Sequence, residues 1–422
     1  MNMNTFRDIT GTHKTVGSPM LVIALLLTAL LLAACGSSGG TTTGSSGTQN
    51  TPTTIGTTVT GLQGATPTTN PAHATPTPGP SASAVPFTSI RMLDSQNGWA
   101  TTSTALLKTT DGGWHWHNVG PTNTTLKFAR GEFFSSQIAW VATQVANSSN
   151  PYAIEVLRTL NGGQSWQTST LTTDNEHGIM GPPNFVNTQN GWLELSSSGG
   201  PAAGSEAVEI YRTTDGGQTW TKVSATTNEQ PNGGLPLGGI KSGISFKDTQ
   251  NGWATASYYA TNNAWLYVTH DAGKTWQKQS LPLNLNASNS EYDTTPPVFI
   301  GNDGLLPVHV STSTQPVLDF YITHDGGQSW TPELLAPFNA TNTYVVDMAH
   351  AWATDTSSNV FYRTVNGGVS WQKEQSAGQT IDALSFINDS EGWAIGSPND
   401  KPVLLHTTDG GQTWQHINYA IQ

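Results

Sequence analysis

One eight-residue pattern recurs seven times along the chain of 422 residues, and no other feature constrains the fold as strongly. Two copies, Thr213–Trp220 and Thr407–Trp414, both read T-T-D-G-G-Q-T-W. The tryptophans that end successive copies lie 41 to 56 residues apart. The third positions are Asp111, Asn161, Asp215, Asp271, Asp325, Asn366 and Asp409, and the last positions are Trp116, Trp166, Trp220, Trp276, Trp330, Trp371 and Trp414. A repeat of this length indicates a supersecondary unit that buries its apolar surface by stacking on the next unit.

A second, shorter motif precedes most copies of the first. It reads Gly-Trp-Ala in its clearest form, as at Gly98–Ala100 and Gly252–Ala254, and the fifth unit has Asn302–Leu306 in its place. Together the two motifs contain thirteen of the 15 tryptophans, and only Trp114 and Trp265 fall outside these positions. The repeat therefore explains most of an unusually high tryptophan content.

Each unit contains four short runs of alternating apolar residues separated by Asn, Asp and Gly, which are strand and hairpin signals. The strands expected in the last unit are Ile381–Phe386, Trp393–Ile395, Val403–His406 and Thr413–Ile417. Seven such units predict an all-β fold, a seven-bladed β-propeller of four-stranded antiparallel blades over residues 87–422. How the ring closes stays open, because every unit carries its four strands in order and the end strands could still exchange.

The first motif has a physical logic that predicts a structural role. Its Asp or Asn is expected to accept hydrogen bonds from amides two residues on and so to close a turn. The fifth position is Gly in all seven copies, including Gly273, which predicts a positive φ there. The terminal tryptophan offers a large apolar face for packing between blades.

The N-terminus predicts export and a lipid anchor. Residues 1–34 combine a mildly basic start with an uncharged apolar run, as in a secretory signal peptide. The run ends at Leu32–Gly36, which resembles the lipobox of bacterial lipoproteins with Cys35 as the lipidated residue; an uncleaved transmembrane helix is the alternative. Residues 35–86 contain no charged residue and are rich in Thr, Ser, Gly and Pro, so we expect a disordered linker. The chain is thus expected to be a membrane lipoprotein on the extracytoplasmic side.

The repeated pattern resembles the Asp-box, or BNR repeat, of sialidases, xyloglucanase-type glycoside hydrolases, sortilin-like receptors and photosystem II assembly and stability factors. Paired with the Gly-Trp-Ala motif, it looks most like the last of these. That resemblance covers residues 87–422 and implies that the Asp-box carboxylates are structural, away from the active face. It also implies a non-catalytic binding or assembly role, with no cofactor and no metal.

Charge and residue counts narrow the function further. A net charge of −12 does not support nucleic-acid binding, and a single Cys excludes an internal disulfide framework. A sialidase would have an early Arg-Ile-Pro motif, whereas Arg91 is followed by Met-Leu. Arg158, Arg212 and Arg363 recur just before the Asp-box and are expected to be structural. A sialidase-like or xyloglucanase-like glycoside hydrolase acting on extracellular glycans stays open as the alternative function.

A binding face is expected on the side opposite the repeated turns, where the longer loops gather. Aromatic and acidic residues cluster there around the fourth unit, and this candidate face consists of Tyr258, Tyr259, Trp265, Glu291, Tyr292 and Asp293. Exposed Tyr and Trp favour protein interfaces and sugar stacking, so the expected partner is a protein or a glycan. The alternative is that these side chains only fill gaps between blades.

Overall fold

The computed structural model describes residues 86–422, apart from residues 123–125, 146–152, 172, 174–176, 198–203, 227–232, 260–261, 284–289, 313–314, 334–335, 337, 341, 356–359, 375–379 and 398–401. The predicted signal peptide, Cys35 and nearly all of the predicted linker therefore lie outside the described residues. Contacts divide the chain into Met1–Ala72 and His73–Gln422, and everything described below belongs to the second unit. Within the described residues there is no helix, and so none that could cross a membrane.

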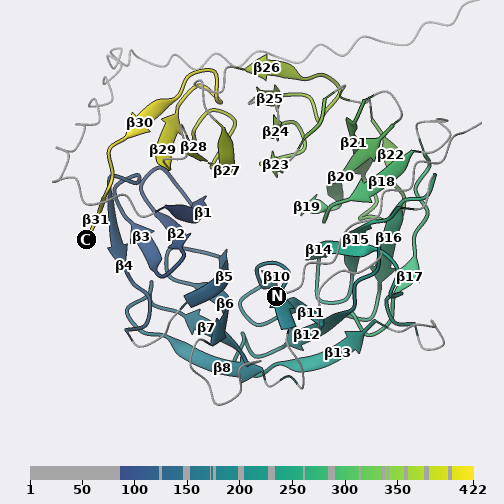
Figure 1. Ribbon diagram of the computed structural model, residues 1–422, viewed down its shortest axis with the longest axis horizontal. Coiled ribbons are helices and arrows are strands. Elements are labelled where there is room, and N and C mark those ends of the chain that lie inside the picture. Colours follow the sequence, from purple (N-terminus) through teal and green to yellow (C-terminus); the bar gives the residue numbers. More distant parts are fainter. Residues whose placement is uncertain are drawn as a thin grey trace, which may run out of the picture. The chain divides into compact units, whose positions relative to one another are not determined.

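Seven antiparallel sheets form a ring, with the strands of each sheet following chain order from centre to rim (Figure 1). Blades 1 and 2 consist of β1 (Phe87–Met92), β2 (Gly98–Thr102), β3 (Leu106–Thr109), β4 (His115–Asn118), β5 (Leu126–Phe133), β6 (Ala139–Val145), β7 (Ile154–Thr159) and β8 (Gln167–Leu171). Blades 3 and 4 consist of β9 (His177–Ile179), β10 (Asn184–Phe185), β11 (Gly191–Ser197), β12 (Val208–Thr213), β13 (Thr221–Ala225), β14 (Ile240–Phe246), β15 (Gly252–Ser257), β16 (Trp265–Thr269) and β17 (Gln277–Lys278). Blade 5 consists of β18 (Glu291–Thr294), β19 (Val298–Ile300), β20 (Asp303–Ser311), β21 (Val317–Thr323) and β22 (Thr331–Pro332). Blades 6 and 7 consist of β23 (Asn342–Val345), β24 (Ala351–Asp355), β25 (Val360–Thr364), β26 (Gln372–Glu374), β27 (Ile381–Phe386), β28 (Gly392–Gly396), β29 (Val403–Thr407) and β30 (Gln415–Ile417).

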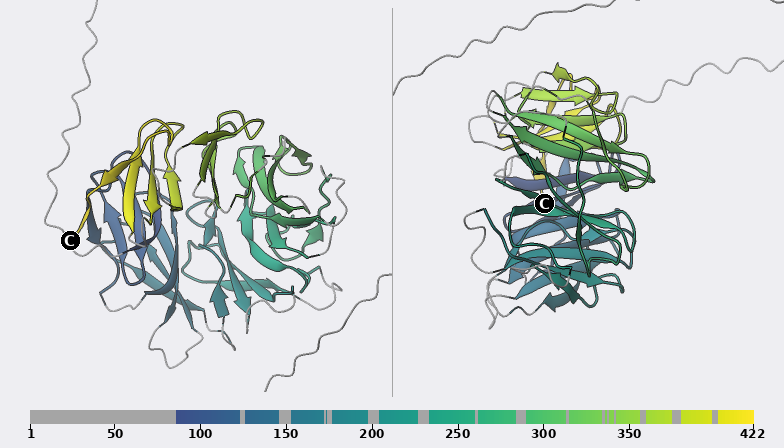
Figure 2. Two further views of the ribbon diagram at one scale, coloured as in Figure 1. Left: turned by 45° about the horizontal axis from the view of Figure 1, so that its top comes forward. Right: turned by 90° about the vertical axis from the view of Figure 1, so that its right-hand side faces the viewer.

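The predicted seven-bladed propeller is confirmed, and in the edge view of the ring the strands run along its axis (Figure 2). Two blades depart from the simple plan, because their inner strand is split into β9 with β10 and into β18 with β19. A Pro-Pro pair interrupts each of them, at Pro182–Pro183 and at Pro296–Pro297. Proline has no N–H to donate to the ladder, so the strand stops and restarts.

The Asp-box turns are closed by a local hydrogen-bond network, illustrated by blade 3. Asp215 Oδ1 accepts from the Thr213 hydroxyl at 2.7 Å and from the Thr219 amide at 3.0 Å, while Oδ2 accepts from the Thr219 hydroxyl at 2.6 Å. The expected acceptance from an amide two residues on is wrong, because two consecutive glycines with positive φ bring the amide four residues on to the carboxylate. Burial raises the pKa of Asp215, but the hydrogen bonds from Thr219 and Thr213 outweigh burial and lower the pKa to about 2.

The fifth Asp-box position has a φ between 85° and 96° in all seven copies, which confirms the predicted need for glycine. The fourth position lies in the same left-handed region, and Ala272 adopts it in blade 4 with a φ of 66°. The Asn copies keep the geometry, because the Asn161 side chain accepts the Ser165 amide and donates to the Ser165 hydroxyl.

The Gly-Trp tryptophans join neighbouring blades. Their side chains are buried, and the Trp140 indole N–H donates to the carbonyl of Gly216 in the Asp-box of the next blade at 2.7 Å. Trp192 and Trp352 make the same contact in blades 3 and 6. The Asp-box tryptophans also lie in the blade cores, either buried, as Trp116 is, or half-buried, as Trp166 is. The fold thus uses both tryptophan positions of the repeat as packing residues.

Every blade takes its main strands from one unit of the repeat, and the two chain ends meet in blade 1. Trp393 of blade 7 donates to the carbonyl of Gly112 in blade 1 at 2.9 Å, which repeats the contact made between other blades. The C-terminal strand β31 (Ala420–Ile421) then pairs in parallel with β4 and becomes a fifth strand on the rim of blade 1. Blade 7 follows its predicted strands closely, from β27 to β30.

Candidate functional site

A cavity of about 210 Å³ lies where the inner strands of blades 2 to 5 face the ring axis. We call it the central cavity. Strands β5, β10, β14 and β19 surround that part of the ring (Figure 1). The residues that line it are Glu132, Gly181, Pro182, Pro183, Asn184, Glu194, Ser242, Gly243, Ile244 and Pro296. The wall is mostly proline, glycine and small polar residues, so its two glutamates are the only ionisable side chains among the described residues that line the cavity.

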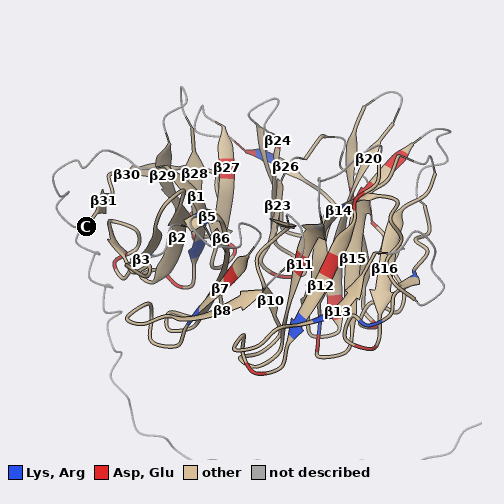
Figure 3. Ribbon diagram, turned by 60° about the horizontal axis from the view of Figure 1, so that its bottom comes forward, with Lys and Arg blue, Asp and Glu red and all other residues tan. Residues whose placement is uncertain are grey.

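Charged residues are sparse along the ribbon (Figure 3), so a buried carboxyl in the cavity wall is unusual for this chain. Glu194 on β11 is 3% exposed, and neither of its carboxyl oxygens has a hydrogen-bond partner among the described residues. Burial and, to a smaller extent, the charge of nearby Glu206 raise the pKa of Glu194 to about 8, against the opposing effect of Lys241. Glu194 is therefore largely protonated at neutral pH and offers one donor and one acceptor to the cavity.

Glu132 on β5 is the second carboxyl of the central cavity. Burial raises its pKa to about 7, and the charge of Arg91 opposes this shift. Arg91 itself donates to the hydroxyl of Tyr344 on the inner strand of blade 6. Because burial dominates at both glutamates, their pKa values are raised together and not driven apart.

A buried lysine fixes the wall next to Glu194. Lys241 on β14 is 3% exposed, and its ammonium lies 2.9–3.2 Å from five backbone carbonyl oxygens. Those carbonyls belong to Glu206, Pro236, Leu237, Gly238 and Gly239. The Lys241 amide also donates to the Glu206 carboxylate at 2.9 Å. The Lys241 ammonium thus holds together the connection that precedes β12 and the connection that follows β13. The next two residues in the chain, Ser242 and Gly243, line the central cavity.

The inner strand of blade 4 has a bulge at this point, with a register shift between Lys241 and Gly243. The bulged Ser242 donates to the carbonyl of Thr294 at 2.6 Å, across the seam to blade 5. Bulges re-aim side chains next to binding sites, and here the bulge turns Ser242 into the cavity wall. A similar shift in β5 leaves Phe128 66% exposed with a φ of 52°.

The six residues predicted to form a binding face are divided by the structure. Tyr259 is 61% exposed, and Tyr258, Glu291 and Asp293 are half-buried. Asp293 accepts hydrogen bonds from the Ser257 side chain and the Tyr258 backbone, while burial raises its pKa. A binding role for these four residues stays a prediction.

The other two residues of that group are not at the surface. Trp265 is 4% exposed and Tyr292 1% exposed, and each belongs to the core between blades. The expectation that they are exposed is wrong, because both lie within strands whose side chains pack into a neighbouring blade. The ring of Trp265 lies 4.8 Å from the Lys241 ammonium and so packs against the cluster beside the central cavity. For these two residues the gap-filling alternative holds.

Sequence reasoning missed Glu132, Glu194 and Lys241. One signal could have found Glu194, because it lies two residues after a Gly-Trp tryptophan, where other units have Thr101, Ala142, Thr255, Thr354 or Ile395. An acid at a position that is otherwise small or apolar points to a local demand for a carboxyl.

The predicted structural arginines do bond to the scaffold. Arg363 donates to the carbonyl of Asp389 in the next blade at 3.0 Å, and Arg212 to that of Thr249 at 3.4 Å. In the part of the chain that the structure describes, no group of three or more His, Cys, Asp or Glu side chains could hold a metal ion.

Comparison with known proteins gives partial matches to two families. The model described as the photosynthesis system II assembly factor YCF48 matches residues 336–422, and the one described as sortilin, neurotensin receptor 3, matches residues 209–335. The photosystem II stability/assembly factor HCF136 of Oryza sativa subsp. japonica is 30% identical over 83 residues, which is 18% of this chain and 19% of that protein. The chain thus aligns with about a fifth of the curated relative.

Solved structures match over a much larger part of the chain. A structure titled YCF48 bound to D1 peptide is 14% identical with a TM-score of 0.50, covering 77% of this chain and 92% of that one. YCF48 from Cyanidioschyzon merolae is 16% identical with a TM-score of 0.50, covering 78% and 96%. The domain is a BNR-type propeller similar to photosystem II assembly factors. An oligogalacturonate lyase in complex with manganese is 8% identical with a TM-score of 0.52, covering 74% and 85%, so the shared fold alone does not decide the function.

Proposed function

We propose that this chain is a non-catalytic propeller that binds an extended peptide segment of a partner protein in its central cavity. The observation that carries this proposal is Glu194, a buried carboxyl that lines the cavity without a hydrogen-bond partner among the described residues. A protonated carboxyl pairs with an amide through one donated and one accepted hydrogen bond. Peptide groups present that combination, and a buried group left unpaired costs about 1–3 kcal/mol until a ligand satisfies it. The peptide bound to the similar YCF48 supports a peptide partner here.

The raised pKa values favour binding over glycoside hydrolysis. A glycosidase needs one ionised carboxylate and one protonated acid, held by environments that push the two pKa values apart. In the central cavity burial raises the pKa of Glu132 to about 7 and that of Glu194 to about 8. Both shifts have the same direction and cause, so the two carboxyls show no division into an ionised carboxylate and a protonated acid. The glycoside hydrolase alternative has no comparable observation in its favour.

The sequence supports a location for this activity. We infer that Cys35 carries a lipid and that residues 35–86 hold the propeller away from the extracytoplasmic face of a bacterial membrane. The lipobox-like Leu32–Gly36 and the uncharged linker support this tether. A scaffold anchored in this way would hold a partner segment near the membrane during assembly.

The peptide proposal is tested on an array of synthetic peptides probed with the full chain. We expect selective retention on a subset of peptides, kept by Glu194→Gln, because an amide offers the same donor and acceptor, and lost in Glu194→Leu. A parallel panel of glycans should give no sugar release. Retention unchanged by Glu194→Leu, no retained peptide, or sugar release that Glu194→Gln abolishes would each overturn the proposal.

The tether is tested with Cys35→Ser in a bacterial host. We expect the variant to leave the membrane fraction or to accumulate as an unprocessed precursor, because no thiol remains to receive the lipid. Fractionation and the intact mass of the protein give the readout. Membrane attachment and a mass equal to those of the unsubstituted chain, apart from the substitution itself, would refute lipidation.

A further inference from the structure

Three departures from the repeat meet at the seam between blade 7 and blade 1, away from the central cavity. The first is His406, which occupies a register position that is cationic in four other blades. The second is Glu391, at a position held by Asn97, Ile138, Asn190, Asn251 and His350 in the other Gly-Trp motifs and by Asp303 in the fifth unit. The third is Trp114, at an Asp-box position that is Gln, Lys or Val in the other six copies. Departures that converge on one seam of a repeat protein indicate a site.

The cationic register position shows what the other seams do. It lies on the third strand, opposite the Gly-Trp tryptophan or its counterpart, and its occupants are Lys108, Arg158, Arg212, Val268, Ile322, Arg363 and His406. Lys108 reaches across its seam and donates to the carbonyl of Ser136 in the next blade at 2.7 Å. Its ammonium also lies 5.2 Å from the ring of Trp99. Arg363 makes the equivalent bond to the carbonyl of Asp389 at 3.0 Å.

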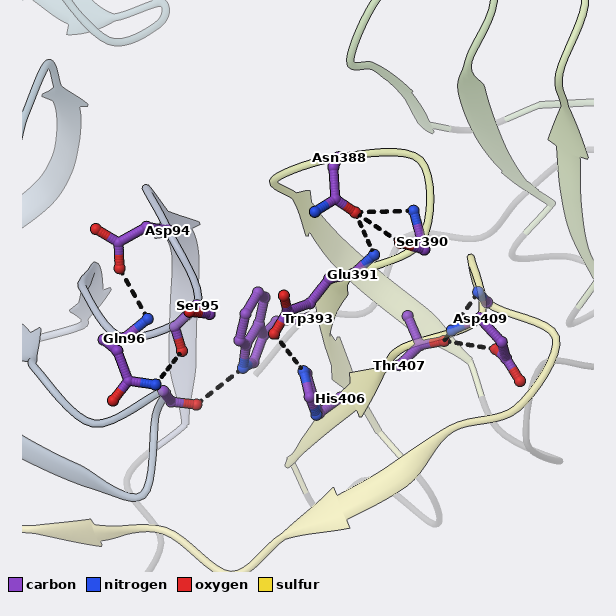
Figure 4. Close-up of polar contacts among 12 residues, drawn as sticks. Asp94, Ser95, Gln96, Asn388, Ser390, Glu391, Trp393, His406, Thr407 and Asp409 are labelled. Carbon is purple, nitrogen blue, oxygen red and sulfur yellow. Dashed lines mark hydrogen bonds and ion pairs between the residues drawn. The ribbon is translucent and has the colours of Figure 1, made fainter. Parts of the chain in front are cut away.

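At the seam from blade 7 to blade 1 the chain does not supply this cation. The shorter His406 packs against Trp393 with ring centres 4.6 Å apart and ring planes tilted by 36°, and its Nε2 lies 3.3 Å from Glu391 Oε1 (Figure 4). The carbonyl that corresponds to that of Ser136 belongs to Ser95. It accepts the Gln96 side-chain amide at 3.1 Å (Figure 4), and none of the described residues that line the cavity here is Lys or Arg.

A cavity of about 310 Å³ occupies the space that a long cationic side chain fills elsewhere. We call it the seam pocket. Its walls include the carbonyl-bearing Ser95 and Gln96 of blade 1, the carboxylate of Glu391, and the indoles of Trp114 and Trp393. A carbonyl and a carboxylate are the acceptors that a guanidinium prefers, and aromatic faces are the surfaces on which it stacks.

We propose that the seam pocket binds the guanidinium of an arginine residue presented by a partner protein. The arginine would donate to the Ser95 carbonyl, as Arg363 does to Asp389, and would pair with Glu391. Arginine fits better than lysine because these acceptors come from two different blades, and the planar fork of a guanidinium can donate to both. The seam pocket shares no lining residue with the central cavity, so this proposal stands independently of the proposed function.

Calorimetry on the full chain tests the proposal with a capped Gly-Arg-Gly peptide and the same peptide carrying citrulline, a neutral isostere. We expect binding of the arginine peptide only. Glu391→Gln should weaken it about tenfold, the loss expected for one charge-assisted hydrogen bond. His406→Arg should abolish binding without lowering Tm, because the new side chain restores the repeat and fills the pocket. Binding of the same peptide to Glu194→Leu should be unchanged, which separates this site from the central cavity.

His117→Arg is the matched control, since it adds the same charge at an exposed position of β4 outside the pocket, and it should leave binding unchanged. The assignment is overturned if the citrulline peptide binds equally, if His406→Arg leaves binding intact, or if no binding occurs at millimolar peptide. A lysine peptide that binds as tightly would overturn the guanidinium preference. Free arginine that binds as tightly as the peptide would overturn the partner-protein source.

Discussion

Replacing Lys241 by methionine is expected to lower the free energy of unfolding by about 1–3 kcal/mol, the cost of leaving buried hydrogen-bond acceptors without their donor. The variant removes the nearby positive charge that favours the ionised form of Glu206, which is 3% exposed. It also removes the donor that lies within 3.2 Å of five backbone carbonyls. Methionine keeps much of the side-chain volume, so the loss reports the charge and its hydrogen bonds and not a cavity.

Denaturant unfolding of the full chain measures this effect. The matched control is Lys222→Met, because Lys222 pairs with Glu209 at 2.9 Å while its own side chain is 51% exposed. An exposed pair contributes about 0–1 kcal/mol, so the control should change stability little. Equal losses in the two variants would contradict the structural role given to Lys241.

Glu194→Gln is expected to stabilise the protein in alkaline solution and to have no such effect in acid. The pKa of Glu194 rises from 4.5 to about 8 on folding, mainly through burial. Below pH 4.5 the carboxyl is protonated in both states, and stability is unaffected. Between pH 4.5 and about 8 the unfolded chain loses the proton that the folded chain keeps, so the wild-type protein becomes less stable as pH rises.

The glutamine variant lacks this titration, so its advantage should grow with pH up to about 8 and then level off. The plateau is up to about 5 kcal/mol, at about 1.4 kcal/mol per unit of pKa difference. Unfolding curves at pH 4, 6 and 8 provide the measurement, and the pH 4 pair is the internal control. A difference between the two proteins that does not depend on pH would show that Glu194 is ionised in the folded state.

The sequence predicted the ring because every level of its repeat agrees. Alternating strands, turn residues and glycines recur together, so a local error in one unit is corrected by the other six. The strands of blade 7 were located to within a residue or two for this reason. The repeat even identified the left-handed position of Gly273 behind the exceptional Ala272.

The candidate site was not predicted, because it depends on residues that depart from the repeat. Glu194 and Lys241 lie on strands of different blades, and only the ring geometry brings them together. The prediction for Trp265 failed because this tryptophan lies outside both repeated motifs and was therefore interpreted as an exposed binding residue. Its ring is instead buried and packs against the Lys241 ammonium. The sequence analysis also assigned the Asp-box hydrogen bond to the amide two residues after the Asp, whereas the donor is the amide four residues after it. Residue spacing alone does not show how two left-handed glycines turn the backbone.

The indole contacts between blades are not the same at every junction of the ring. Where the chain ends meet, the Trp393 indole donates a hydrogen bond to the Gly112 carbonyl, and β31 pairs with β4 of blade 1. Two separate interactions therefore hold this closure. Blade 5 has Leu305 in place of the Gly-Trp tryptophan, and a leucine has no N–H to donate to blade 6. Its junction with blade 6 relies on apolar packing around Leu305 and Phe320. The closure between the chain ends therefore has an indole hydrogen bond and an added strand, whereas the junction of blades 5 and 6 has neither in the described residues and is joined by the chain itself.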